Sequence, residues 1–145
     1  MDFAIISLII SSFAIIISFY FSFTSSYKGI LDRYNDCITE IDRILINNPE
    51  LIAIYDECKI ETKKNDELFM NKMEAFIYLH LNYFENAYFH YLCKKSLLLR
   101  RQKCVWCNFI KEFFKNKYCV TVFNENKDLY DSSFVIYIKK IINKL

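Results

Sequence analysis

The run from Phe3 to Phe23, FAIISLIISSFAIIISFYFSF, constrains the fold of this chain more than any other feature. It contains 21 residues and no charged residue, proline or glycine. An α-helix rises about 1.5 Å per residue, so a helix of this length matches the roughly 30 Å hydrocarbon core of a bilayer. The run therefore predicts one transmembrane helix, within residues 1–26, that precedes the rest of the chain.

Small residues recur along this helix at spacings of three or four positions. They are Ala4, Ser7, Ser11, Ala14, Ser18, Ser22 and Ser25. At about 100° per residue they lie within an arc of roughly 80°. Small residues let two helix backbones approach closely, so this side predicts a transmembrane packing face and a homo-oligomer. Two alternatives stay open: the serines can bond back to carbonyls of their own helix, or the same side can line a pore.

The charges beside the run predict its orientation in the inner (cell) membrane. Lys28, Arg33 and Arg43 follow the run, whereas only the amino group and Asp2 precede it. Because positive charge marks the cytoplasmic side, we expect the N-terminus outside and the remaining chain in the cytoplasm. Six cysteines and the absence of an Asn-x-Ser/Thr site agree with a reducing compartment. A cleaved signal peptide is less consistent with the sequence, because it needs a basic start and a shorter apolar core.

The composition predicts an all-α fold, one N-terminal transmembrane helix followed by a small bundle of about five helices. One glycine and one proline are too few for the tight turns of a β-sandwich or barrel. The chain is 54% hydrophobic and 18% aromatic, enough to form a packed core. We expect a juxtamembrane helix at residues 27–47 and a cytosolic helical bundle at residues 48–145.

Apolar periodicity and capping residues give the expected helices of the bundle. They span about residues 49–58, 66–99, 102–116, 118–130 and 132–144, with a surface loop at 59–65 and a turn at Arg100 and Arg101. The expected caps are Asn48 for the first helix, Asn65 or Asp66 for the second and Asp131 for the last. Tyr118 to Phe123 also has the composition of a strand, but a lone strand would have no partner, so a helix is expected. The helices expected at residues 102–116 and 132–144 should direct apolar side chains inward. These side chains are Val105, Trp106, Phe109, Phe113, Phe134, Ile138, Ile141 and Leu145.

Four side chains resemble the ligand set of a small zinc site: His90, Cys93, Cys104 and Cys107. Both pairs fall inside expected helices, whereas structural zinc sites place at least one pair on a turn. Buried cysteine and histidine are common in helical cores, so no metal and no cofactor is expected.

No other constellation favours catalysis. His80 and His90 belong to no motif that would activate a cysteine, and a single glycine rules out a Gly-rich phosphate loop. Glu85 lies among aromatic residues and should pair with a cation on a neighbouring helix. The sequence therefore predicts a protein that is not an enzyme.

One basic cluster stands out in a chain of net charge +2. It consists of Lys94, Lys95, Arg100, Arg101 and Lys103. Such a cluster can contact nucleic acid, a nucleotide or anionic lipid. It can also simply complement the negative end of a helix, which is the more common role.

Four short motifs occur together in this chain. They are Asn48-Pro49-Glu50-Leu51, Tyr83-Phe84-Glu85-Asn86, Trp106 and Tyr130-Asp131-Ser132-Ser133-Phe134. In this combination the chain resembles uncharacterised bacterial proteins that have one N-terminal span and a small helical cytosolic domain of unknown function. The resemblance implies an all-helical cytosolic bundle and no established activity. Some single-span proteins of similar build occur in phage-defence loci, where they resemble membrane-acting effectors controlled by a nucleic-acid or nucleotide signal.

Two functional hypotheses follow from these features. In the first, the span self-associates in the lipid bilayer and the helical domain binds a cytosolic protein partner without catalysis. In the second, the oligomer is an effector or channel whose pore is lined by the serines and gated by a nucleotide or nucleic acid on the basic cluster.

Overall fold

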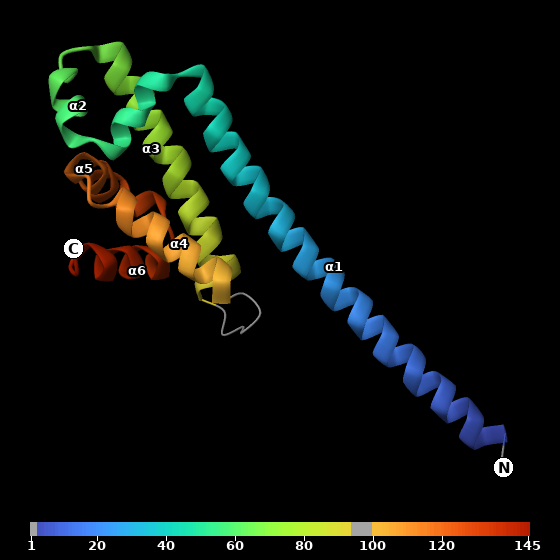
Figure 1. The fold of residues 1–145 in the computed structure, drawn as a ribbon. Coiled ribbons are helices and arrows are strands. Elements are labelled where there is room, and N and C mark those ends of the chain that lie inside the picture. The colour runs from blue at the N-terminus through green and yellow to red at the C-terminus, as the bar shows by residue number, and fades with distance from the viewer. Residues whose placement is uncertain (1–2, 94–99) are drawn as a thin grey trace. The chain divides into compact units, whose positions relative to one another are not determined.

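The computed structural model describes the backbone of residues 3–93 and 100–145, and the side chains of these residues except 3–10, 27, 30, 31, 34 and 100–102. All regular structure in these ranges is helical (Figure 1), and none of the described residues forms a strand. The all-α fold is therefore confirmed for the described part of the chain. The chain forms two compact units, an N-terminal unit, Met1–Asp42, and a helical unit, Arg43–Leu145.

The first helix, α1, spans Phe3–Asn47 without a break. The helices expected at residues 1–26 and 27–47 are thus one continuous helix. Gly29 does not interrupt it, and a Cβ atom at this position would meet no other atom within 4 Å. The helix ends just before Pro49, which lacks the N–H needed to continue it and disfavours helical geometry in the residue before it.

The segment after α1 differs from the prediction in two ways. A 3₁₀-helix, η1, spans Pro49–Tyr55, where an α-helix was expected, and α2 spans Glu57–Thr62, where a loop was expected. In η1, Leu51 and Ile54 are three positions apart and both buried, which suits the three-residue turn of a 3₁₀-helix. In α2, Ile60 is buried and fixes an otherwise polar segment. Asn48 precedes η1 but makes no side-chain cap there, because its amide donates to the Ile44 carbonyl instead (3.2 Å).

The helix predicted for residues 66–99 is shorter and changes its geometry. α3 spans Glu67–Ala87, and the Asp66 side chain caps it by accepting a hydrogen bond from the Phe69 N–H (3.0 Å). A π-helical turn, η2, follows at Tyr88–Leu92, where the Cys93 N–H donates to the Tyr88 carbonyl (2.9 Å). Residues 94–99, the end of the predicted helix, lie outside the described residues.

The remaining helices are α4 (Arg100–Phe113), α5 (Lys117–Asn126), the 3₁₀-turn η3 (Lys127–Leu129) and α6 (Ser132–Ile142). The turn expected at Arg100 and Arg101 is wrong, because both belong to the first turn of α4. α4 ends before the predicted residue 116, because Asn116 instead caps α5 by accepting from the Tyr118 N–H (2.9 Å). The helix predicted from Tyr118 is confirmed. Asp131 caps α6 as expected, accepting from the Ser133 N–H (2.8 Å).

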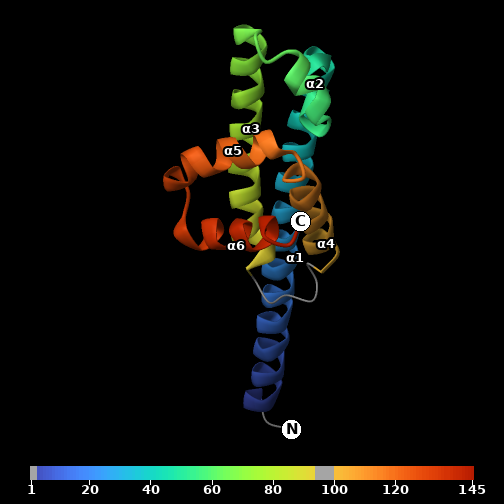
Figure 2. The same cartoon turned by 90° about the vertical axis from the view of Figure 1, so that its left-hand side faces the viewer.

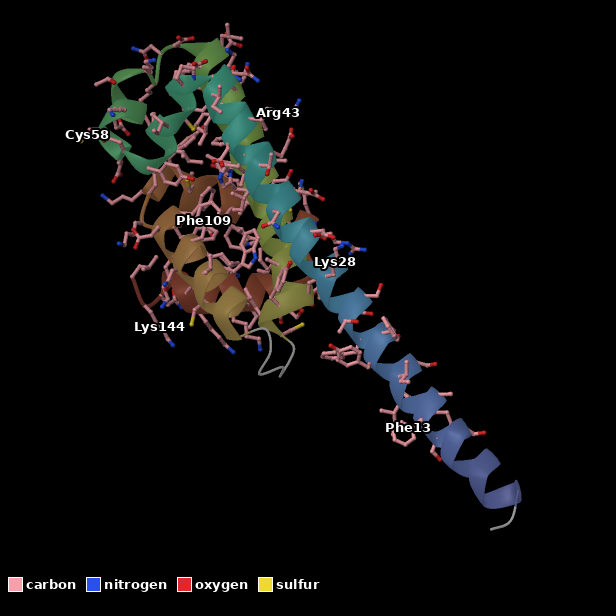
Figure 3. All side chains as sticks on the ribbon, turned by 45° about the vertical axis from the view of Figure 1, so that its right-hand side comes forward. Phe13, Lys28, Arg43, Cys58, Phe109 and Lys144 are labelled. Carbon is pink, nitrogen blue, oxygen red and sulfur yellow. The ribbon has the colours of Figure 1, made fainter. Side chains whose placement is uncertain are left out.

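In the helical unit, α4 runs back along α3, while α5 and α6 cross these two helices (Figure 1, Figure 2). The core between them is mostly aromatic and aliphatic. Its largest fully buried side chains are Trp106, Phe84, Phe113, Phe123, Phe134, Ile54, Met73, Ile77, Leu81, Ile110, Ile138 and His80. Figure 3 shows Phe109 directed from α4 into this interior.

Two residues expected to face the core do not. Val105 is 42% exposed and Leu145 is 56% exposed. Trp106 and Ile110 define the inner side of α4, so Val105, one position before Trp106, is turned away from the core. Leu145 follows the end of α6 at Ile142, where the helical periodicity that buries Ile138 and Ile141 no longer applies.

Candidate functional site

The apolar segment of α1 is the most unusual surface of the molecule. Its large hydrophobic side chains are exposed on all sides of the helix, at Phe13, Ile15, Ile16, Ile17, Phe19, Tyr20, Phe21 and Phe23. In Figure 3, Phe13 points away from the ribbon. Exposed apolar surface of this extent marks a surface that another apolar phase or partner covers.

The backbone groups of this segment and the hydroxyl of Thr24 are satisfied within the helix. The α-helix pairs the backbone groups, and the Thr24 hydroxyl donates to the carbonyls of Tyr20 (2.9 Å) and Phe21 (3.0 Å). Satisfied backbone groups and apolar side chains are the two properties that a hydrocarbon environment demands. Over the part of the chain that was described, no helix meets the length and hydropathy required to cross a membrane.

The small residues expected to form a packing face lie on this same helix. Ser11, Ala14, Ser18, Ser22 and Ser25 are all exposed. The side chains of Ala4 and Ser7, the first two members, lie outside the described set. Because α1 is unbroken through this region, the spacing places the described members on one side of it. Their contact with a second helix stays a prediction.

The predicted basic cluster falls largely outside the described residues. Lys94 and Lys95 belong to the undescribed segment, and the side chains of Arg100 and Arg101 are also undescribed. Lys103 is half-buried in α4. A role of this cluster in anion or lipid contact therefore stays a prediction.

The four zinc-ligand candidates do not come together as a metal site. His90 is half-buried in η2, and Cys104 is exposed on α4. The Cys93 thiol donates to the Phe89 carbonyl (3.2 Å), and the Cys107 sulfur lies 3.3 Å from the Tyr137 hydroxyl. Within the described ranges, no three histidine, cysteine or acidic side chains are grouped so that they could hold a metal ion.

His80 occupies the centre of the aromatic core, a position that sequence reasoning did not assign. Its ring stacks on Phe113 (5.1 Å between centroids) and meets Phe76 edge-on (4.4 Å). Its Nδ1 lies 2.8 Å from the Phe76 carbonyl, so this nitrogen donates and the neutral tautomer carries its proton there. Nε2 is buried and has no partner among the described residues. Burial lowers the pKa of His80 to about 4, so the ring is neutral at pH 7.

Glu85 has a partner of a different kind from the one expected. Among the described residues Glu85 forms no ion pair with a cation on a neighbouring helix; instead, the Glu85 carboxylate accepts a hydrogen bond from the Asp131 N–H (2.7 Å). Asp131 is the cap of α6, so this contact connects α3 to the beginning of α6. A carboxylate at a helix N-terminus also complements the helix dipole.

Asn116 connects η1 to the start of α5, and the sequence did not predict this contact. Its side-chain amide donates to the Ile54 carbonyl (2.8 Å), while its oxygen caps α5. It is one of the buried polar residues of the helical unit. The residue type and its place between two helices could have indicated the cap, but nothing in the sequence indicated the contact with η1.

One surface hollow of the helical unit is balanced in charge. It has a volume of 340 Å³ and is lined by Glu50, Lys63, Asp66, Leu68, Phe69 and Lys72. In it, the Lys72 ammonium is 3.1 Å from the Glu50 carboxylate, and the Lys63 ammonium lies 4.9 Å from the Phe69 ring centroid. Lysines already held by such contacts leave little charge for an anionic ligand.

The described structure thus defines an all-helical protein with an exposed apolar helix and a separate aromatic-core unit. Comparison with known protein families, curated proteins and solved structures finds no match to this chain.

Proposed function

We propose that this chain is a single-pass membrane protein of the inner (cell) membrane, whose span self-associates through its small-residue face. Its helical unit serves as a non-catalytic interaction domain for a cytosolic protein partner. The observation that supports this function is the exposed apolar surface of α1 at residues 11–23, in a chain whose helical unit has its own core.

The energetics favour a lipid environment for this segment. Eight large apolar side chains of α1 within residues 11–23 are exposed. Removing one such side chain from water is worth about 1.5–3 kcal/mol, so covering all of them is worth on the order of 10 kcal/mol or more. Self-association alone covers one side of a helix, whereas lipid covers every side.

The proposed orientation places the helical unit in the cytoplasm. Lys28 and Arg33 are exposed on α1 after the apolar segment, and Lys28 and Arg43 are labelled in Figure 3. Cations within about 15–20 residues of a span favour the cytoplasmic side.

Alkaline carbonate extraction of membranes tests the anchor. We expect the full chain to stay in the membrane pellet, and a variant with Ile16→Lys and Phe19→Lys to be released. Each lysine near the centre of a span costs about 2.5–3.5 kcal/mol. The matched control, Leu68→Lys with Leu129→Lys, places two lysines at exposed positions of the helical unit and should leave the chain in the pellet. Release of the unaltered chain would reject the membrane anchor.

Crosslinking in the membrane tests the packing face. Replacing Ser11 and Ser18 with leucine should reduce crosslinked oligomers several-fold, because leucine keeps two backbones apart. Ser12→Leu is the matched control, since Ser12 is a serine of the same segment that lies off the face. Oligomers that persist unchanged in the double variant would show that this side is not the contact. Ion leakage that depends on Ser11 and Ser18 would instead support the alternative function, a ligand-gated effector or channel.

A further inference from the structure

The outer side of α6 combines exposed lysines with an exposed aliphatic residue. Phe134, Ile138 and Ile141 face the core, and the opposite side of the helix carries Ile136, Lys139, Lys140 and Asn143. At about 100° per residue these four lie within an arc of roughly 100°. We name these four residues the α6 outer face. Lys144 and Leu145, which follow the helix, are also exposed, and Figure 2 shows α6 on the near side of the helical unit.

The charges of this region differ from those of the rest of the helical unit. Residues 132–145 contain three lysines and no acidic residue. In the rest of the helical unit Lys63, Lys111 and Lys127 are in no ion pair within the described residues, whereas five other lysines are paired with carboxylates. These pairs are Lys59–Asp56, Lys64–Glu61, Lys72–Glu50, Lys115–Glu112 and Lys117–Glu57. No ion pair within the described ranges involves Lys139, Lys140 or Lys144, so these cations are available to an external anion.

Helix capping explains only part of this arrangement. Lys139 and Lys140 lie in the last turn of α6, where they complement the negative end of the helix dipole. That effect does not require an exposed apolar residue on the same side of the helix. Ile136 is nevertheless 55% exposed, one turn before Lys139 and Lys140.

The apolar character continues beside α6. Tyr137 packs against Tyr88 of η2 (5.1 Å between ring centroids), and Tyr88 packs in turn against Phe89 (5.2 Å), which is exposed. An exposed aromatic side chain therefore neighbours the lysine-rich helix. Cations with interleaved apolar side chains are typical of protein surfaces that lie at a membrane interface.

We infer that the α6 outer face docks on an anionic lipid surface. In this arrangement the ammonium groups of Lys139, Lys140 and Lys144 contact lipid phosphates, and Ile136 enters the boundary between headgroups and acyl chains. The inference rests on the proposed membrane anchor, which keeps the helical unit near the bilayer and raises its effective concentration at the surface. Two contacts hold the start of α6 in place for such docking. The Asp131 side chain caps its first turn, and the Glu85 carboxylate of α3 accepts a hydrogen bond from the Asp131 N–H.

The side chains favour lipid over nucleic acid. A surface that holds single-stranded nucleic acid combines cations with aromatic rings on which bases stack. The α6 outer face itself carries no aromatic ring, and its apolar residue, Ile136, gains more from entering lipid than from contact with bases.

Lysine footprinting of the full chain in nanodiscs tests the inference. Discs of phosphatidylcholine alone are compared with discs that contain about 30 mol% phosphatidylglycerol, because each lysine near an anionic surface contributes about a fivefold preference. We expect acetylation of Lys139, Lys140 and Lys144 to slow at least about fivefold in the anionic discs, and about 0.5 M salt to reverse the effect. Lys63 and Lys64 serve as the internal reference and should react equally in both discs.

Paired variants sharpen the test. Replacing Lys139 and Lys140 with glutamine should remove the protection of Lys144, since docking loses about a factor of 25. Replacing the adjacent exposed pair Lys63 and Lys64 with glutamine makes the same change in charge and should leave that protection intact. Fluorescence of the buried Trp106 verifies that both variants are folded.

The outcomes separate this inference from the proposed function. If the chain is washed out of the discs, the anchor and the inference both fail. If the chain is retained but the α6 lysines react equally in both discs, only the inference is overturned. Protection that requires added RNA in place of anionic lipid would also overturn it.

Discussion

The apolar segment of α1 and the core of the helical unit contain the same residue types, but these residues are exposed in the first and buried in the second. Phe19 on α1 is 74% exposed, whereas Phe84 on α3 is fully buried. Both residues lie on regular α-helices. The difference is that Phe84 meets rings from another helix, Phe109 (5.4 Å) and Phe113 (5.0 Å), while the N-terminal unit consists of a single helix.

This difference shows what a helix needs in order to bury its apolar side chains. A single helix satisfies its backbone hydrogen bonds but cannot cover its own surface. The helical unit covers α3 with η1, α4 and α5, and only then do residues such as Phe84 leave water. The described part of the N-terminal unit has no second layer of its own, so its apolar side chains stay exposed.

The largest expected effect contrasts two phenylalanines directly. Phe84→Ala should lower the free energy of unfolding of the helical unit by about 3–5 kcal/mol, because it leaves a cavity among packed rings. Phe19→Ala, the same change on α1, should lower it by less than about 0.5 kcal/mol. Denaturant unfolding of the full chain in detergent, followed by Trp106 fluorescence, measures both values. A large loss of stability in Phe19→Ala would show that the two regions share a core.

A second prediction uses the buried polar group in this core. The pKa of His80 is about 4 in the folded chain, below its ordinary value of 6.5, so between these values the unfolded chain binds a proton that the folded chain excludes. Stability is therefore fully present above about pH 6.5 and is lost as the pH falls toward about 4. We expect the free energy of unfolding to fall by about 2 kcal/mol between about pH 8 and about pH 5.

His80→Leu is the matching variant for this pH dependence. Leucine fills a similar volume and cannot be protonated, so the slope of stability against pH should decrease by the contribution of His80. His90 is present in both proteins and contributes equally to both curves. Urea unfolding at a series of pH values measures the slopes. An unchanged slope in the variant would mean that His80 is not the titrating group.

The smallest expected effect concerns the contact between α3 and the cap of α6. Glu85→Ala should lower the free energy of unfolding by about 1 kcal/mol, because the Asp131 N–H loses its acceptor. Glu125→Ala removes an exposed carboxylate elsewhere and should change stability by less than about 0.5 kcal/mol. Thermal unfolding followed by circular dichroism compares the two. Equal values for both variants would show that the contact contributes nothing.

Local patterns predicted most of the helices, because capping residues and apolar periodicity act within a few positions of the chain. Asp66 and Asp131 begin their helices as their residue types indicate. The π-helical turn at Tyr88–Leu92 was not predictable in this way. It brings Tyr91 against Trp106 (6.4 Å between ring centroids), and a contact between distant residues leaves no local pattern.

The candidate sites were likewise predictable only where they depend on local patterns in the sequence. The apolar run and its small-residue face are visible in the sequence because both are periodic features of one helix. The lysines of α6 were not singled out, because their significance depends on which side of α6 faces the core and on the lack of carboxylate neighbours among the described residues. The partner of Glu85 was assigned incorrectly for the same reason.

The sequence by itself determined that the described chain is helical and that its first helix carries a long uncharged apolar segment. Both properties depend on residue type and on spacing along one helix. Only the tertiary structure decided that His80 is enclosed by rings, that Asn116 donates to the Ile54 carbonyl and that Glu85 holds the start of α6. These contacts join residues from separate helices, and their partners are selected by packing rather than by sequence neighbours.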